Sequence, residues 1–107
     1  MILKFFKSPT CGPCKMFAPQ VKKAVSETQI KEEDYDVSTE VGLAEATKYN
    51  VTHSGSAVLT DDTGKILFTW EHPVPSDQLI KVIKQFLWYF IKINLLNLFN
   101  LLFYNKN

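Results

Sequence analysis

Cys11 and Cys14 are the two cysteines of this 107-residue chain, and they stand three positions apart. A loop this short hardly restricts the unfolded chain, so the pair would be a poor structural crosslink. A structural zinc site usually needs four ligands, and no second Cys or His pair occurs at the required spacing. The pair is therefore better suited to making and breaking a disulfide bond.

The position of the two cysteines also favours redox chemistry. Residues 2–6 are apolar and aromatic and precede Ser8-Pro9, which predicts a short buried strand. Pro13 suits the first turn of a helix, and Pro19 should kink that helix without ending it. Because a helix N-terminus stabilises a thiolate, the first cysteine can attack a disulfide, and the second, one turn further on, can resolve the mixed disulfide.

The rest of the chain predicts the elements that must hold this turn. A weaker strand is expected at 33–37, and a helix at 41–49 capped by Ser38 or Thr39. The inward positions of that helix are expected to be Val41, Ala44, Ala46 and Tyr49. Strands at 56–60 and 65–70 flank a hairpin turn at 61–64, and a last helix starts at Ser76. The order β-α-β-α-β-β-α predicts an α/β domain with a four-stranded mixed sheet flanked by helices.

Composition predicts one domain at residues 1–87 and an extension at 88–107. The net charge of +1 gives no reason to expect a nucleic-acid partner, and no signal-peptide pattern is present, so we expect a cytoplasmic protein. The extension is rich in Leu, Phe and Asn. Lys92 and the repeated asparagines argue against a membrane span, which needs about 20 apolar residues. We expect it to continue the last helix and to cover an apolar surface or join a partner, for example in a dimer, with no part in the chemistry.

The run from Cys11 through Gly12, Pro13, Cys14 and Lys15 to Pro19 resembles the active site of the thioredoxin family. The resemblance continues to the helix ending near Leu87, and it implies a thioredoxin-like fold without the family's first strand and helix. It also implies an enzyme that reduces protein disulfides, with Cys11 as nucleophile and Cys14 as resolving thiol. Electrons would come from a thioredoxin-reductase-like enzyme or from glutathione, and the redox-active disulfide would serve without a further cofactor.

The sequence departs from the family pattern at several positions. The aromatic residue before the first cysteine is Thr10, and the buried carboxylate is replaced by Phe5. The cis-proline of the substrate-docking loop falls at Gly55, between Ser54 and Ser56. Because a cis bond before a non-proline residue costs about 2.5–4 kcal/mol, we expect a trans bond and weaker substrate docking.

Two histidines add alternatives at the same site. His53 precedes the docking loop, and His72 stands where the family has a glycine in a neighbouring loop. They are expected to be exposed loop residues, but a histidinium near Cys11 would favour its thiolate, and imidazoles beside two thiolates could bind a metal. The alternative functions are therefore a glutaredoxin-like, glutathione-dependent reductase, or a metal-binding, cluster-binding or interaction module that uses the same cysteines.

Overall fold

A computed structural model describes residues 1–104 and confirms the predicted order of elements. The first half contains the strand β1 (Ile2–Lys7), the helix α1 (Gly12–Thr28), the strand β2 (Lys31–Asp36) and the helix α2 (Glu40–Lys48). The second half contains the strands β3 (Ser56–Thr60) and β4 (Ile66–Trp70) and the helix α3 (Ser76–Tyr104). The second strand begins two residues earlier than predicted.

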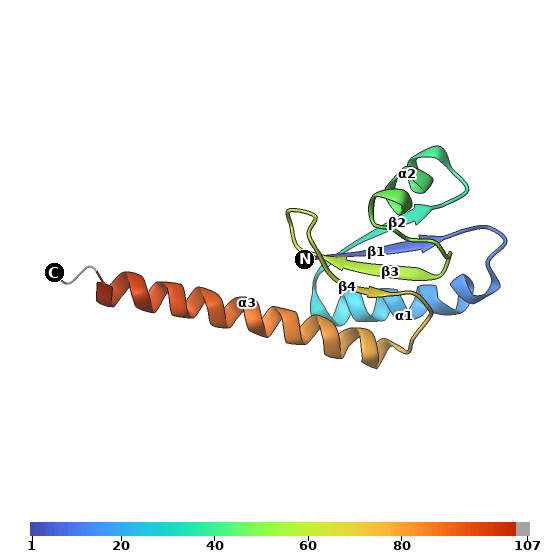
Figure 1. Ribbon diagram of the computed structural model, residues 1–107. Coiled ribbons are helices and arrows are strands. Elements are labelled where there is room, and N and C mark those ends of the chain that lie inside the picture. The colour runs from blue at the N-terminus through green and yellow to red at the C-terminus, as the bar shows by residue number, and fades with distance from the viewer. Residues whose placement is uncertain (105–107) are drawn as a thin grey trace.

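The four strands form one mixed sheet in the order β2-β1-β3-β4. Strand β1 runs parallel to β2 and antiparallel to β3, which is itself antiparallel to β4. Helices α1 and α3 cover one face of this sheet, and α2 lies against the other (Figure 1). The sheet is therefore a central layer that brings the end of β1 and the start of α1 to one edge of the domain.

Successive side chains of β1 point to opposite faces of the sheet, and this divides the core into two parts. Leu3 and Phe5 point to the α1 and α3 side, where they join the larger buried cluster. Phe6 points to the other side and packs with Ala46 of α2 and with Tyr49, the C-cap residue of that helix. This period of two is the pattern of a strand buried on both faces.

Helix α2 approaches the end of β2 more closely than the sequence pattern suggested. The Thr39 hydroxyl caps the helix by accepting a hydrogen bond from the Gly42 N–H at 3.0 Å. A Cβ placed on Gly42 would overlap the backbone carbonyl of Asp36. This close approach turns Gly42 inward together with Ala46 and Tyr49. The prediction that Val41 and Ala44 face inward is wrong, because both are exposed.

We expect Gly42→Ala to destabilise the fold by about 1–3 kcal/mol, the usual cost of forcing extra volume into a packed site. The added methyl group meets backbone atoms, which cannot rotate away as a side chain can. Urea unfolding of the full chain measures the loss. Leu43→Ala is the control, because Leu43 is an exposed neighbour on the same helix. Equal stability of the two variants would show that the close approach is not needed.

The α2 side of the sheet also holds a buried charge. Lys4, only 6% exposed, lies 3.3 Å from carboxylate oxygens of both Glu33 and Glu45. Its ammonium also lies 4.6 Å from the centre of the Tyr49 ring. Burial alone would lower the pKa of Lys4, but its contacts with Tyr49 and the two carboxylates hold that pKa above its ordinary value. Burial and the hydrogen bond to Glu33 raise the pKa of Tyr35 to about 12.

Helix α3 runs far beyond the domain (Figure 1). Its first turns pack on the core through Leu79 and Ile83, which are fully buried. The prediction that the extension continues this helix is confirmed as far as Tyr104, and its last residues, 105–107, lie outside the described part. The extension does not cover the domain, because most of its large apolar side chains from Trp88 onward are exposed. Within residues 1–104, α3 is the one helix long and apolar enough to cross a membrane.

Candidate active site

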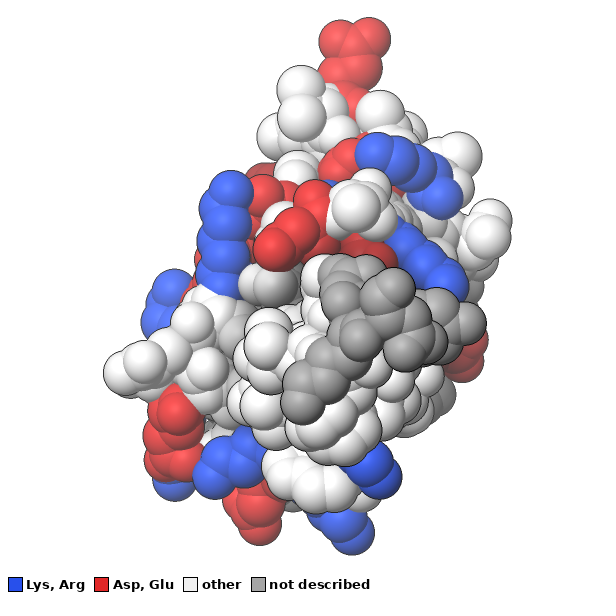
Figure 2. Space-filling model, turned by 90° about the vertical axis from the view of Figure 1, so that its left-hand side faces the viewer, with Lys and Arg blue, Asp and Glu red and all other residues white. Residues whose placement is uncertain are grey.

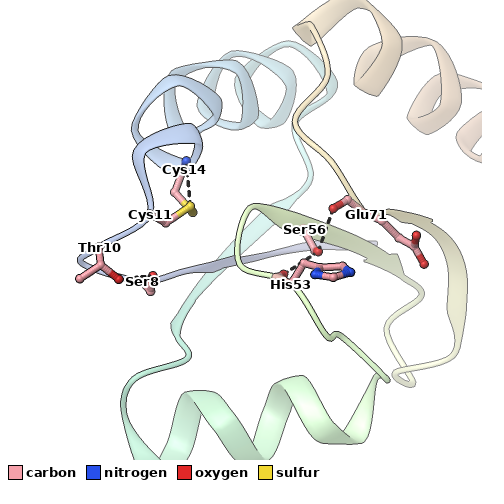
Figure 3. The surroundings of a disulfide bond; sticks show 7 residues. All are labelled: Ser8, Thr10, Cys11, Cys14, His53, Ser56 and Glu71. Atoms are coloured by element: carbon pink, nitrogen blue, oxygen red, sulfur yellow. Dashed lines mark hydrogen bonds between the residues drawn. A yellow bond between two sulfur atoms is a disulfide. The ribbon is translucent and has the colours of Figure 1, made fainter.

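Cys11 and Cys14 form a disulfide bond at the start of α1, where the chain leaves β1 (Figure 3). Cys11 is the N-cap residue of the helix, and its Sγ accepts a hydrogen bond from the Cys14 N–H at 3.1 Å. Pro13 occupies the first turn, where a missing N–H costs nothing. The helix therefore directs a backbone donor at the Cys11 sulfur, which is the arrangement that stabilises a thiolate.

The two sulfurs differ in their access to solvent. Cys14 is 3% exposed and belongs to the main core cluster, whereas Cys11 is partly exposed at its edge. Phe5, at the position of the family's buried carboxylate, is 1% exposed and packs edge-on against Phe17 with ring centres 5.5 Å apart. The interior behind Cys14 is therefore apolar. The proton balance of the resolving thiol must be met by solvent or by a group outside this cluster.

The loop containing Gly55 lies directly against the disulfide. A Cβ on Gly55 would stand 3.7 Å from the Cys14 Sγ and 3.7 Å from the Pro73 Cγ. The Gly55 N–H donates a hydrogen bond to the Phe6 carbonyl at 2.8 Å, which extends the pairing of β1 with β3. No peptide bond among residues 1–104 is cis, so the expectation of a trans Ser54–Gly55 bond is confirmed. The proline that the family has at this position lacks an N–H and could not make this hydrogen bond. The bond between the loop and β1 therefore depends on the glycine.

Ser56 ties this loop to the next one. Its buried hydroxyl lies 2.7 Å from the His53 carbonyl oxygen and 3.3 Å from that of Glu71, and it donates its hydrogen bond to these oxygens (Figure 3). The contact bridges the chain before β3 and the chain after β4. Of the three predicted docking residues, Gly55 therefore lies against Cys14, and Ser56 ties the loop to the chain after β4. Their role in substrate docking remains a prediction.

We expect Gly55→Ala to cost about 1–2 kcal/mol of stability, the usual penalty for an L side chain in left-handed backbone. Gly55 has φ +86°, while the space around its Cβ is ordinary contact distance, so the loss would come from the backbone alone. Gly12→Ala is the matched control, because a Cβ there meets nothing within 4 Å. Chemical denaturation of both oxidised variants gives the comparison. An equal stability of the two would contradict the strain argument.

The histidines lie close to each other. The His53 and His72 rings are both exposed and stack with centres 6.3 Å apart. The His53 ring points away from the sulfurs in Figure 3. Within residues 1–104, no three His, Cys, Asp or Glu side chains come together in a group that could hold a metal ion. The structure thus places the two histidines next to each other, but among the described residues they form no metal-binding group with the cysteines.

The remaining motif residues lie on the surface around the disulfide. Thr10 is exposed, with its hydroxyl 3.5 Å from that of Ser8, and Lys15 points to solvent after Cys14. Pro19 stands within α1, which continues past it to Thr28 as predicted. The kink expected at Pro19, and the support of the active site by Lys15 and Pro19 that the family resemblance implies, remain predictions.

A shallow apolar groove of about 280 Å³ lies beside the disulfide, between α1 and the chain leading into α3. Met16 and Phe17 line one side, and residues 73–75 line the other. Met16 fits the apolar spacing of α1, but it is 77% exposed at the groove's rim. A residue at this position of α1 has the same helical spacing whether it faces the sheet or this groove. The hydrophobic period alone therefore does not tell a core position from a groove position.

Comparison with known proteins agrees with this geometry. The family model described as Thioredoxin matches residues 1–85. The chain belongs to the thioredoxin family. Its Cys11–Cys14 pair is a CXXC redox site, and the protein is a thiol–disulfide oxidoreductase.

Solved thioredoxin structures share the fold. Thioredoxin 1 from Thermosipho africanus TCF52B superposes with a TM-score of 0.73 at 18% identity, covering 83% of this chain and 97% of that one. A mutant thioredoxin from Halobacterium salinarum NRC-1 gives 0.71 at 27% identity, covering 78% of this chain and 72% of that one. Fasciola hepatica thioredoxin gives 0.67 at 27% identity, covering 78% of each chain. No curated protein sequence matches the chain.

Proposed function

We propose that this thioredoxin-family protein reduces disulfide bonds in other proteins. In the reduced form, the Cys11 thiolate attacks one sulfur of the client disulfide, and the other client sulfur leaves as a thiolate, which takes a proton from solvent. Cys14 then attacks the Cys11 sulfur, releasing the second client thiol and forming the Cys11–Cys14 bond. Two electrons and two protons pass to the client, and the product is the oxidised state that the structure contains.

The observation that carries this proposal is the unequal access to the two sulfurs. A client can reach the partly exposed Cys11, where the Cys14 N–H supports the thiolate. Cys14 is buried, so it meets only the mixed disulfide that forms in front of it. The helix thereby separates the attacking thiol from the resolving thiol.

The apolar groove beside the disulfide gives the client a place to bind. An apolar side chain next to a client cystine would contact Met16 and Pro73 while a sulfur of that cystine approaches Cys11. Gly55 lies between Pro73, at the edge of this groove, and Cys14. A protein segment with an exposed cystine and a neighbouring apolar residue fits this surface better than a small polar disulfide does.

The oxidised protein needs an electron donor to complete the cycle. A thioredoxin-reductase-like enzyme is the proposed donor, and a reducing cytoplasm is the proposed location. Glutathione is the alternative donor, and it would make the protein glutaredoxin-like.

Coupled reduction of insulin disulfides tests both points. The full chain is supplied with NADPH and either thioredoxin reductase or glutathione with glutathione reductase, and NADPH consumption is followed. We expect insulin-dependent consumption with thioredoxin reductase. Consumption with glutathione alone would support the glutaredoxin-like alternative. Failure with both donors, when dithiothreitol readily reduces the Cys11–Cys14 bond, would refute reduction of protein disulfides.

A further inference from the structure

The outer part of α3, from Trp88 to Phe103, contributes no residue to either core cluster of the domain. Between Trp88 and Phe103, ten large apolar side chains are each 55–65% exposed. The 18-residue window that qualifies this helix as a span has none of its residues buried. A core helix of a soluble protein can pass the same test of length and hydropathy, but it does so while buried. This segment therefore lacks the environment that its side chains require.

We propose that this segment, residues 87–104, inserts across a lipid bilayer and anchors the redox domain at the membrane surface. At 1.5 Å per residue it is about 27 Å long, close to the hydrocarbon core of about 30 Å. It contains no acidic residue, and Lys92 is its one charged residue. Figure 2 views the molecule from the far end of α3 and shows the charged side chains mainly around the helix, on the domain.

The distribution of apolar side chains around the helix favours lipid over a second copy of the chain. Leu96 and Leu98 are two residues apart and so lie on nearly opposite sides, as do Phe99 and Leu101. A helix–helix contact buries only one stripe of each partner and would leave the opposite side in water. A bilayer surrounds every side at once. A helix that is apolar all round is the type that membranes accept.

Lys92 is the main feature of the sequence that argues against a span, and its position in the structure weakens that objection. The Lys92 Nζ lies 5.2 Å from the centre of the Trp88 ring, one helical turn nearer to the domain. The charge is thus carried back toward the end of the segment, as lysines do when they reach for a membrane interface. Trp88 and Tyr89 stand at the same end, where aromatic residues commonly mark the interface.

Asn94, Asn97 and Asn100 are the polar residues that remain within the segment. Their spacing of three places them along one flank of the helix and leaves the remaining surface apolar. Side-chain amides within membranes are tolerated where they hydrogen-bond to one another or to a neighbouring helix. They lower the hydropathy of the span without adding charge.

Anchoring by this segment would leave the redox site open. Helix α1 begins at the edge of the domain opposite to the side from which α3 projects (Figure 1). The Cys11–Cys14 bond would therefore face away from the membrane, toward proteins in the adjoining solution.

Flotation of the full chain with phosphatidylcholine vesicles that contain a minor share of phosphatidylglycerol tests the proposal. We expect the protein to float with the vesicles and to stay with them after alkaline carbonate and high-salt washes. Protein that remains in the dense fraction, as a monomer or as a self-assembled oligomer, would overturn the proposal. Protein that floats but is released by carbonate only adsorbs to the surface, and this result would overturn it as well.

The double variant Leu96→Lys, Leu98→Lys places charge on opposite sides of the segment. We expect at least a tenfold drop in its floated fraction. The matched control is Val41→Lys, Leu43→Lys, which changes two exposed apolar residues of α2 in the same way and should float like the unchanged protein. Circular dichroism and reduction of the Cys11–Cys14 bond verify that both variants keep the folded domain. Equal flotation of the two variants would contradict insertion through residues 87–104.

Discussion

Cys11→Ser will abolish the reduction of protein disulfides by this chain, leaving the background rate of the reductant alone. The serine hydroxyl is not ionised at neutral pH, so the hydrogen bond from the Cys14 N–H no longer supports a thiolate at the exposed position. Cys14 cannot take over the attack, because it is 3% exposed behind the helix start. Insulin reduction with excess dithiothreitol, with and without the variant, measures the loss.

Cys14→Ser separates attack from resolution. Cys11 remains free to attack, but the buried thiol that would release the client is gone, so the mixed disulfide should accumulate. Non-reducing gels and intact mass should show a stable one-to-one adduct with a cystine-containing client, and dithiothreitol should release it. Cys11→Ser should give no such adduct. An adduct of equal yield through Cys14 in the Cys11→Ser variant would reverse the assigned roles.

Lys4→Ala should destabilise the domain by about 3–5 kcal/mol, because it removes the buried cation and leaves Glu33 and Glu45 with only exposed lysines as counter-charges. The Lys4 ammonium lies 3.3 Å from oxygens of Glu33 and Glu45, whose side chains are only 25% and 18% exposed. The loss is measured by urea unfolding at neutral pH.

Lys31→Ala provides the control for the Lys4 prediction. Lys31 also pairs with Glu33, at 3.2 Å, but its side chain is 67% exposed. An exposed pair is usually worth no more than about 1 kcal/mol, so this variant should be nearly as stable as the unchanged protein. Similar losses in the two lysine variants would show that burial does not strengthen the Lys4 pairs.

The placement of the redox site could be predicted from sequence because it depends on local features. A strand that ends at Ser8-Pro9 and a helix that opens at Pro13 are both set by residues within one short segment. The contact between Gly55 and Cys14 depends on tertiary structure, and it was reached through the family resemblance. Its backbone bond to Phe6 was not foreseen, because it follows from replacing a proline that cannot donate.

The failures of prediction lie on the α2 side of the sheet. Val41 and Ala44 fit an apolar period, but the contact of Gly42 with the Asp36 backbone rotates a different face inward. Residues without a side chain leave no apolar signal, so this orientation depends on packing. The Lys4 cluster was missed for a related reason. Its position between Leu3 and Phe5 on a buried strand was the available sign that this lysine needs buried partners.

The continuation of α3 was predictable from its helix-forming residues, but its exposure was not. Composition shows that residues 88–104 are apolar, and it cannot tell whether they fold back onto the domain. The structure shows that α1 already occupies the sheet face beside α3, so the helix runs past the end of the sheet (Figure 1).

Redox titration of the Cys11–Cys14 couple in the full chain tests the central claim most directly. The protein is equilibrated in glutathione and dithiothreitol buffers, trapped with an alkylating reagent and read by mass. We predict one two-electron transition between about −180 and −270 mV, the range of working thiol–disulfide carriers. A disulfide that stays oxidised at potentials below about −300 mV would be a structural one. Thiols that never form the disulfide would show that Cys11 and Cys14 are not a redox couple. Either result would contradict the account.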